Sequence, residues 1–237
     1  SLTLRPEELH LKAGGESIED TSKILSTYGN AFMLRTDSDK KLDEFKKYSN
    51  IPIINGLSPS SHPTQVLSDI FTIQEIKKKS ISKLKLCWIG DANNNMMNSL
   101  IEASIKFSIS LNIACPKSYQ PNKKLISLIK KQKGKIKIFN KKEIAIKNSD
   151  VVMTDKIISL NDKVNKKKKL KSFKNFKVDT KTMNLAKKDA IFLHCLPRGS
   201  EVTEEVFLGK QSRVWQQALN RVYVQKSILL YCFGKLR

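Results

Sequence analysis

The stretch LKLCWIGDANNNMMNSLIEASIKF, residues 84–107, decides the fold class of this 237-residue chain. Its first six residues are mostly apolar, which is typical of a strand buried on both faces of a parallel sheet. Polar residues 90–95 then interrupt the apolar pattern, and residues 96–107 have the spacing of an amphipathic helix. A strand followed by a turn and a helix predicts an α/β architecture.

The same alternation extends along the rest of the chain. The predicted strands are Ala31–Leu34, Ile51–Ile54, Leu84–Ile89, Leu111–Ala114, Lys135–Phe139, Val151–Thr154 and Ala190–His194. The predicted helices are Ser17–Tyr28, Pro63–Lys77, Met96–Phe107, Pro121–Lys131 and Trp215–Phe233. A polar, lysine-rich stretch at residues 77–83 indicates a boundary between two units.

The charge balance is strongly basic, with 44 Lys and Arg against 22 Asp and Glu and a formal net charge of +22. Such an excess is typical of proteins that bind polyanions. However, only six of the 44 are Arg, the residue that nucleic-acid readers favour, and the lysines are scattered along the chain. Solvated lysines, including the run Lys166–Lys169, are therefore the favoured interpretation, and a basic nucleic-acid-binding module is a weaker alternative.

The four cysteines, Cys87, Cys115, Cys195 and Cys232, lie far apart and form no Cys-x-x-Cys pair. This spacing argues against a disulfide framework and against a zinc site, and it fits a reducing cytoplasm. No apolar run approaches the roughly 18–20 residues that span a bilayer, and the start SLTLRPEELH has no apolar core of a signal peptide. We expect a cytoplasmic protein that binds neither membranes nor a metal or organic cofactor.

Polar side chains follow the predicted strands at the positions where parallel α/β sheets bind ligands, beyond the carboxyl ends of the strands. Arg35, Asp155 and Cys195 each follow such a strand directly. His62-Pro63-x-Gln65 places an imidazole and an amide at a helix N-terminus, where backbone N–H groups favour an anion. The sequence therefore predicts a site at one edge of the sheet.

Each of these residues also has a structural interpretation. His62 can be a buried or capping residue, Arg35 can form a surface ion pair with Asp37 or Asp39, and Asp155 can cap a turn. A nucleophilic pair of Cys195 with its neighbour His194 is disfavoured, because adjacent strand residues point to opposite faces. Gly90-Asp91-Ala92 lacks the G-x-G-x-x-G pattern, which disfavours a dinucleotide site.

Taken together, the motifs resemble the aspartate/ornithine carbamoyltransferase family. The matching stretches are ESIEDTSKILSTYGNAFMLR (16–35), IPIINGLSPSSHPTQVLSDIFTIQE (51–75), WIGDANNNMMNSLIEASIKF (88–107), VVMTDKIIS (151–159), FLHCLPRGSEVTEEVF (192–207) and ALNR (218–221). The tetrapeptide HCLP at residues 194–197 indicates the ornithine branch, since the aspartate branch has Pro in place of Cys195.

The resemblance implies a fold of two parallel-sheet α/β domains of the carbamoyltransferase type, the first of them incomplete. Residues 1–79 would be the C-terminal part of a carbamoyl-phosphate-binding domain, and residues 80–214 an ornithine-binding Rossmann-like domain. Residues 215–237 would be a helix that packs back on the first domain. The implied activity is transfer of a carbamoyl group from carbamoyl phosphate to ornithine in arginine biosynthesis, by a homotrimer.

The resemblance also implies individual roles. The residues implied to bind carbamoyl phosphate are Arg35, His62, Gln65, Arg221 and, reaching into a neighbouring subunit, His10. The residues implied to hold ornithine are Asn94, Asp155, Ser159, Cys195 and Leu196. Among these, Arg35, His62 and Cys195 are expected to be catalytic.

Three departures from the family pattern weaken these expectations. The family's early Ser-x-Arg-Thr-Arg phosphate-binding motif is absent, so we expect a fragment or a degraded gene product with low affinity for carbamoyl phosphate. Residues 156–161 replace the family's Thr-Trp-Val-Ser-Met-Gly, and Leu219 replaces the usual Glu before Asn220 and Arg221. A carbamoyltransferase with another amine acceptor and a non-catalytic remnant therefore stay open as alternatives.

Overall fold

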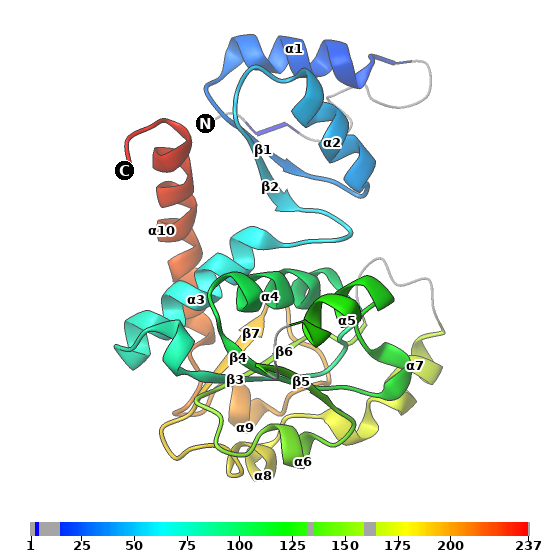
Figure 1. Ribbon diagram of the computed structural model, residues 1–237, viewed down its shortest axis with the longest axis vertical. Coiled ribbons are helices and arrows are strands. Elements are labelled where there is room, and N and C mark those ends of the chain that lie inside the picture. Colours follow the sequence, from blue (N-terminus) through cyan, green and yellow to red (C-terminus); the bar gives the residue numbers. More distant parts are fainter. Residues whose placement is uncertain (1–2, 5–14, 132–134, 159–164, 237) are drawn as a thin grey trace.

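The computed structural model describes residues 3–4, 15–131, 135–158 and 165–236, and these form two parallel sheets (Figure 1). The smaller sheet pairs β1 (Phe32–Arg35) with β2 (Ile53–Leu57). The larger sheet has the order β5-β4-β3-β6-β7, with all pairs parallel. Its strands are β3 (Lys85–Ile89), β4 (Ser110–Ala114), β5 (Ile136–Phe139), β6 (Val151–Asp155) and β7 (Ile191–Cys195). Each overlaps a predicted strand, and the α/β class is confirmed.

Two helices accompany the smaller sheet. They are α1 (Ile18–Tyr28), which the sequence predicts, and α2 (Asp39–Tyr48), which it does not. The side chains of Ser17 and Ser38 cap them by accepting backbone N–H groups. Phe45 is the only residue of α2 that is fully buried, and its ring packs 5.7 Å from that of Phe32. A helix so rich in charge has too few apolar positions to show a clear period.

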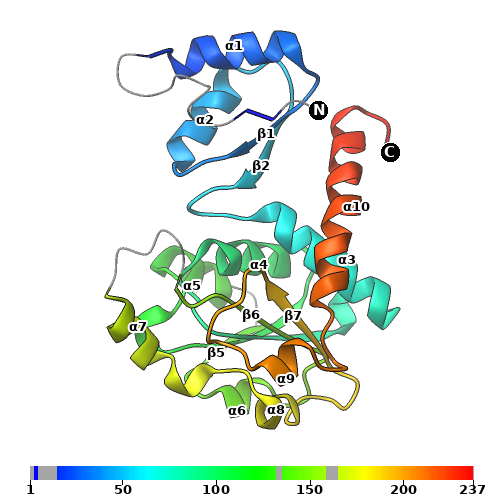
Figure 2. The same ribbon diagram turned by 180° about the vertical axis from the view of Figure 1, so that it is seen from behind.

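Helices cover both faces of the larger sheet (Figures 1 and 2). One face carries α3 (Pro63–Lys77), α4 (Asn95–Lys106) and α5 (Lys123–Lys130), and the other carries α6 (Lys142–Ala145), α8 (Thr180–Met183) and α9 (Glu204–Phe207). The remaining helices are α7 (Lys166–Ser172) and α10 (Val214–Cys232). Three short 3-10 turns lie at Ile81–Lys83, Lys117–Tyr119 and Lys174–Phe176.

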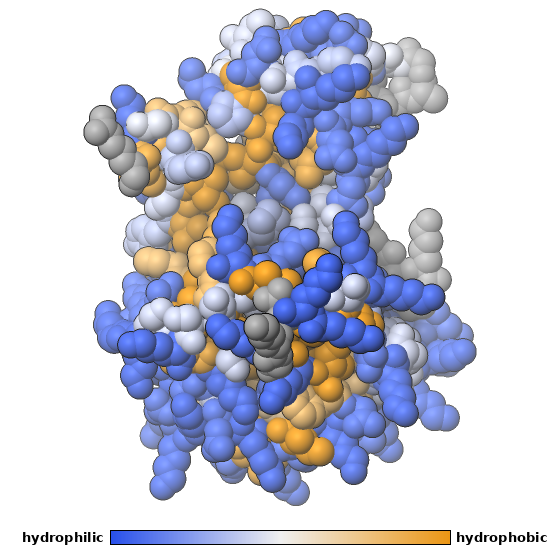
Figure 3. Space-filling view, in the orientation of Figure 1, coloured by the Kyte–Doolittle hydropathy of each residue, from blue (hydrophilic) through white to orange (hydrophobic). Residues whose placement is uncertain are grey.

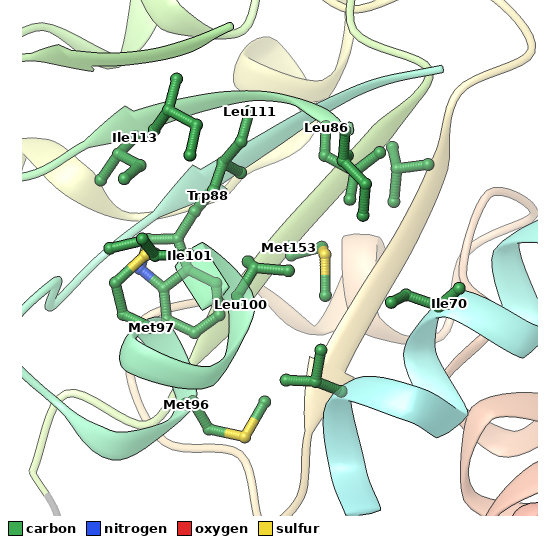
Figure 4. Close-up of a cluster of buried hydrophobic side chains, with 14 of the residues drawn as sticks. Ile70, Leu86, Trp88, Met96, Met97, Leu100, Ile101, Leu111, Ile113 and Met153 are labelled. Atoms are coloured by element: carbon green, nitrogen blue, oxygen red, sulfur yellow. The ribbon is translucent and has the colours of Figure 1, made fainter. Parts of the chain in front are cut away.

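Alternate residues of β3 enter two separate cores, as the strand period requires. Leu86 and Trp88 pack against α4 and α3 (Figure 4), whereas Cys87 and Ile89 pack on the opposite face. The indole Nε1–H of Trp88 donates to the carbonyl of Asp91 at 3.1 Å, so the polar atom of this buried ring has a partner. The apolar run in the sequence is therefore explained by burial on both faces.

The long helix α10 crosses α3 and extends beyond the larger sheet toward the smaller one (Figures 1 and 2). Large apolar and aromatic side chains are exposed along its length, among them Trp215, Leu219, Tyr223 and Tyr231. Figure 3 shows an orange, hydrophobic area where α10 lies in Figure 1. Within the described part of the chain, no helix is long and apolar enough to cross a membrane.

We expect Ile73→Ala to lower the free energy of unfolding by about 2–5 kcal/mol, because it leaves a cavity at a fully buried position of α3. Leu67→Ala on the same helix removes a side chain that is 38% exposed, and it should cost on the order of 1 kcal/mol or less. Urea denaturation followed by circular dichroism measures both values. Equal losses would contradict this account of the core.

Candidate active site

The site lies at the point where the strand order of the larger sheet reverses. From β3 the chain moves outward through β4 and β5, and it then returns to pair β6 with the other edge of β3. Crevices that bind ligands form at the carboxyl ends of strands beside such a point. Asp91 follows β3, and Asp155 and Cys195 end β6 and β7 as direct partners in the sheet register.

The start of α3 is held in place by α4. The backbone N–H of His62 donates to Ser99 Oγ at 2.8 Å. The side-chain amides of Asn95 and Asn98 donate to the carbonyls of Ser58 and Ser60 at 3.0 and 2.9 Å. These contacts fix the loop between β2 and α3 on the larger unit.

His62 itself is buried at the N-terminus of α3, and its side chain makes no capping hydrogen bond. Burial, together with the smaller effects of the positive charges of Arg221 and Arg35, lowers its pKa to about 4. His62 is therefore neutral at neutral pH, in a positive electrostatic environment.

Arg35 ends β1 and is exposed. Among the described residues, Arg35 forms no ion pair with Asp37 or Asp39, the two partners that the sequence offers. Asp37 instead pairs with Lys41 Nζ at 3.1 Å, and Asp39 accepts a hydrogen bond from Ser60 Oγ at 2.7 Å. Asp39 thus helps to tie the His62 loop to α2, and Arg35 lies close enough to act on His62.

The pKa of Cys195 is affected by both the carboxylates and the guanidinium groups of the site. Burial raises the pKa of its thiol well above the ordinary value, and the carboxylates of Asp155 and Asp69 raise it further. Arg221 and Arg35 act in the opposite direction. Charged side chains from β1, α3, β6 and α10 therefore all act on this one thiol, which stays protonated at neutral pH.

Asp155 is ionised less readily than a free carboxyl group, because burial is the main effect that raises its pKa to about 6. A hydrogen bond from the backbone N–H of Lys156 at 2.7 Å opposes the rise, as does the nearby His194, whereas Glu201 and Asp91 add to it. Asp155 is thus ionised at neutral pH, as a carboxylate that receives an ammonium group must be.

Asn94 has a structural role in α4. Its Oδ1 accepts the N–H of Met97 at 2.8 Å as the helix N-cap, and its Nδ2 donates to the carbonyl of Asp91 at 3.2 Å. These contacts occupy both ends of its amide, so the contact with ornithine stays a prediction. Leu196 follows β7 and is 40% exposed. His10 and Ser159 lie outside the described residues.

The sequence predicts that the lysine run 166–169 is exposed, and this prediction is wrong for Lys169. Lys169 is buried, and its Nζ lies 2.7 Å from Asp91 Oδ2, whose side chain is equally buried. The other three lysines of the run are exposed. The partner of Lys169 is distant in the sequence, and a buried ammonium requires such a partner.

His194 points away from Cys195, as the strand period predicts. Its ring packs against Phe207 in the second core, and its Nε2 lies 2.9 Å from Glu201 Oε1. Cys195 packs on the opposite core. Glu201 is a residue that sequence reasoning missed, together with Asp69, Gln217, Asn95 and Ser99. For Asp69 a signal existed, because it follows Gln65 by four residues on one helix face.

A surface pocket of about 540 Å³ lies elsewhere, beside the loop after β7. It is lined by Lys177, Arg198, Gly199, Ser200, Val202, Thr203, Glu204 and Glu205, and so by none of the predicted site residues. Among the residues that the structure describes, no group of three or more His, Cys, Asp or Glu side chains could hold a metal ion. This pocket is therefore separate from the candidate site, which consists of the charged residues that act on Cys195.

The titration of His62 tests this grouping. We expect a pKa of about 4, and a higher value in Arg221→Met because protonation then meets less positive charge. Arg35→Met should raise it less. NMR of the imidazole measures all three, and Lys226→Met on the same helix α10 is the control. An unchanged His62 pKa in Arg221→Met would place the guanidinium elsewhere.

His62 should also affect stability in acid. Its folded pKa of about 4 is below its ordinary 6.5, so the unfolded chain takes up the proton first. The free energy of unfolding therefore falls as the pH drops from about 6.5 to about 4.

Comparisons with known proteins match the whole chain. The profile of the aspartate/ornithine carbamoyltransferase carbamoyl-P binding domain matches residues 2–75, and that of the family's Asp/Orn binding domain matches residues 82–232. An ornithine carbamoyltransferase of Caldicellulosiruptor saccharolyticus is 43% identical over 100% of this chain and 78% of its own length. One of Staphylothermus marinus is 40% identical over 97% of this chain and 74% of its own.

Solved structures agree with these relatives. The ornithine carbamoyltransferase of Pyrococcus furiosus superposes with a TM-score of 0.90 and 36% identity, covering 100% of this chain and 76% of that one. The anabolic enzyme of Campylobacter jejuni gives a TM-score of 0.87 and 38% identity, covering 93% of this chain and 75% of that one. With both domain profiles matched, relatives of about 40% identity over the whole chain and a TM-score of 0.90 to a solved member, the chain belongs to the aspartate/ornithine carbamoyltransferase family.

Proposed function

We propose that this chain transfers a carbamoyl group from carbamoyl phosphate to the δ-amine of ornithine, forming citrulline and phosphate. The observation that carries the proposal is that Asp155 and Cys195 end neighbouring strands as partners in the sheet register, while the positive charges of Arg221 and Arg35 act on the Cys195 thiol. The reaction needs positive charge at one end of the site and negative charge at the other. The names of the relatives support ornithine as the acceptor.

Arg35 and Arg221 would bind the phosphate end of carbamoyl phosphate. The departing phosphate carries concentrated negative charge, and fixed cations stabilise it more in a partly buried site than in water. Neutral His62 and the amide of Gln65 would contact the carbamoyl group, the imidazole by donating to the carbonyl oxygen as it becomes an oxyanion. Nothing in this step requires a metal or a cofactor.

Asp155 would accept the α-ammonium group of ornithine, which leaves the δ-amine near Cys195. A free alkylammonium has a pKa near 10.4, so the site must favour the neutral amine before attack. The nitrogen then forms a bond to the carbonyl carbon, the bond from that carbon to the phosphate oxygen breaks, and the proton lost by nitrogen is taken up by the departing phosphate. Holding both reactants in this geometry supplies a large part of the rate. We place the thiol of Cys195 beside the attacking amine, where it makes a hydrogen bond without a charge.

The remaining parts of the proposal concern organisation. We propose that residues 1–79 bind carbamoyl phosphate, that residues 80–214 bind ornithine, and that residues 215–237 pack back on the first domain; the change of matching profile between residues 75 and 82 supports the first boundary. We also propose a homotrimer in which His10 reaches a neighbouring site, a role for Ser159 beside ornithine, and a place in arginine biosynthesis in the cytoplasm. The family resemblance supports these points.

Citrulline formation tests the proposed function. With carbamoyl phosphate and ornithine, we expect one phosphate released per citrulline, measured together in a colorimetric assay. Putrescine lacks the α-ammonium and α-carboxylate groups that the site would hold, so it should react far more slowly, and acetylornithine lacks the charge that Asp155 would bind. If either amine reacts faster than ornithine, the proposed acceptor is wrong. If no amine reacts, the proposed transferase activity is wrong.

Cys195→Ala should lower kcat by about 10- to 100-fold, since it removes one hydrogen-bonding group from the reacting centre. Its melting temperature should stay within a few degrees, because Cys195 is a partly buried residue that packs against the core from the end of β7 and is not one of the fully buried core residues. Cys87→Ala is a matched control, in which a fully buried thiol is removed from the same sheet. That variant should lose stability and keep its kcat; the reverse pattern would contradict the role of Cys195.

A further inference from the structure

Asp69 is a buried carboxylate one helical turn beyond Gln65 in α3. Its Oδ1 accepts two hydrogen bonds, from Gln65 Nε2 at 2.8 Å and from Gln217 Nε2 at 2.7 Å. Its Oδ2 is buried without a hydrogen-bond partner in the described structure. The side chain is completely inaccessible to solvent, so its two amide partners are the groups that compensate for its burial.

The second partner extends this contact to the strand that carries Cys195. Gln217 lies on α10, and its Oε1 accepts the backbone N–H of His194 in β7 at 3.0 Å. A continuous path of three hydrogen bonds therefore joins Gln65 to the end of β7, through one residue of α3 and one of α10. The two residues joined by the middle hydrogen bond, Asp69 and Gln217, are 148 positions apart in the sequence.

This arrangement fixes which end of the Gln65 amide is free. A side-chain amide has a donating NH₂ end and an accepting oxygen end, and an ionised carboxylate only accepts. Asp69 must therefore take the Nε2 end of Gln65, and Oε1 is left to accept. The NH₂ group of carbamoyl phosphate is a donor, so the free end of Gln65 has the complementary chemistry.

We propose that Asp69 is a positioning residue for carbamoyl transfer: it orients the amide of Gln65 toward the carbamoyl NH₂ group and couples it to α10 and β7. The proposal rests on the proposed function, because it assigns Gln65 a carbamoyl ligand. Burial raises the pKa of Asp69 to about 6 while the two glutamine amides and Arg221 lower it, so the carboxylate is ionised at neutral pH.

A purely structural role would need only a buried hydrogen bond between α3 and α10, and the chain offers a matched control for that case. Thr72 lies one turn further along α3, is fully buried, and accepts a hydrogen bond from Asn220 Nδ2 at 3.0 Å. Thr72→Val removes this acceptor with little change in shape, and it does not contact Gln65.

The test measures KM for carbamoyl phosphate and for ornithine, kcat and the melting temperature in whole-chain variants. Asp69→Leu should raise the KM for carbamoyl phosphate by about 10- to 100-fold, because Gln65 loses its anchor. Asp69→Asn should stay within about threefold of the unchanged chain, since its Oδ1 can still accept from both amides. Thr72→Val should lower the melting temperature and leave this KM unchanged, because Asn220 still donates to Glu75 Oε2 at 2.8 Å and so keeps Arg221 in place.

Three results would overturn the proposal: an unchanged KM for carbamoyl phosphate in Asp69→Leu, an equal rise in Thr72→Val, or no rescue by Asn. If the unchanged chain forms no citrulline, the proposed function fails, and the positioning role is decided by NMR of the Gln65 side-chain NH₂ signal. Slow hydrogen exchange of that signal in the unchanged chain and in Asp69→Asn, but not in Asp69→Leu, supports the orientation. Equal exchange in all three contradicts it.

Discussion

The packing of α10 against α3 holds the candidate site together. α3 begins with the residues proposed to bind the carbamoyl group, and α10 carries Arg221. Polar side chains lie between the two helices at successive turns, where acceptors on α3 meet amide donors on α10. The acceptors are Asp69, Thr72 and Glu75, and the donors are Gln216, Gln217 and Asn220. Such a set of buried hydrogen bonds specifies one register, since a shift of α10 would leave buried polar groups without partners.

That register decides where Arg221 lies. Asn220 is fully buried and donates to Thr72 and Glu75, so the next residue on α10 is fixed in direction. Leu219 stands where the family pattern has Glu before Asn220 and Arg221. In the structure Leu219 is 48% exposed, and the contacts that hold this turn come from its neighbour Asn220. The positive charge of Arg221 acts to lower the pKa of both His62 and Cys195.

Much of the fold could be predicted from the sequence, because apolar runs mark strands that are buried on both faces. The order of those strands could not, since β3 pairs with β6, a strand that begins more than sixty residues later. Helix α2 was missed because it buries little apart from Phe45. The buried state of Lys169 was missed for a related reason: its partner Asp91 is brought to it only by the folded sheet.

The candidate site divides in the same way. Arg35, Asp155 and Cys195 could be proposed from their places at strand ends, and the family resemblance supplied their roles. Asp69 and Gln217 could not be proposed as a pair, because their contact depends on how α10 packs against α3. Reactive or charged residues at strand ends can therefore be predicted from the sequence. The polar residues that hold them in position cannot, because their contacts form only in the folded chain.

A crystal structure with a stable bisubstrate analogue, in which a phosphonate is joined through an acetyl group to the δ-nitrogen of ornithine, tests the central claim most directly. We expect the phosphonate to lie within hydrogen-bond distance of Arg35 and Arg221, and the α-ammonium within that distance of Asp155. Cys195 should lie beside the joining amide. An analogue bound in the pocket beside Lys177 and Arg198, or one that contacts only one of these ends, would contradict the single shared site.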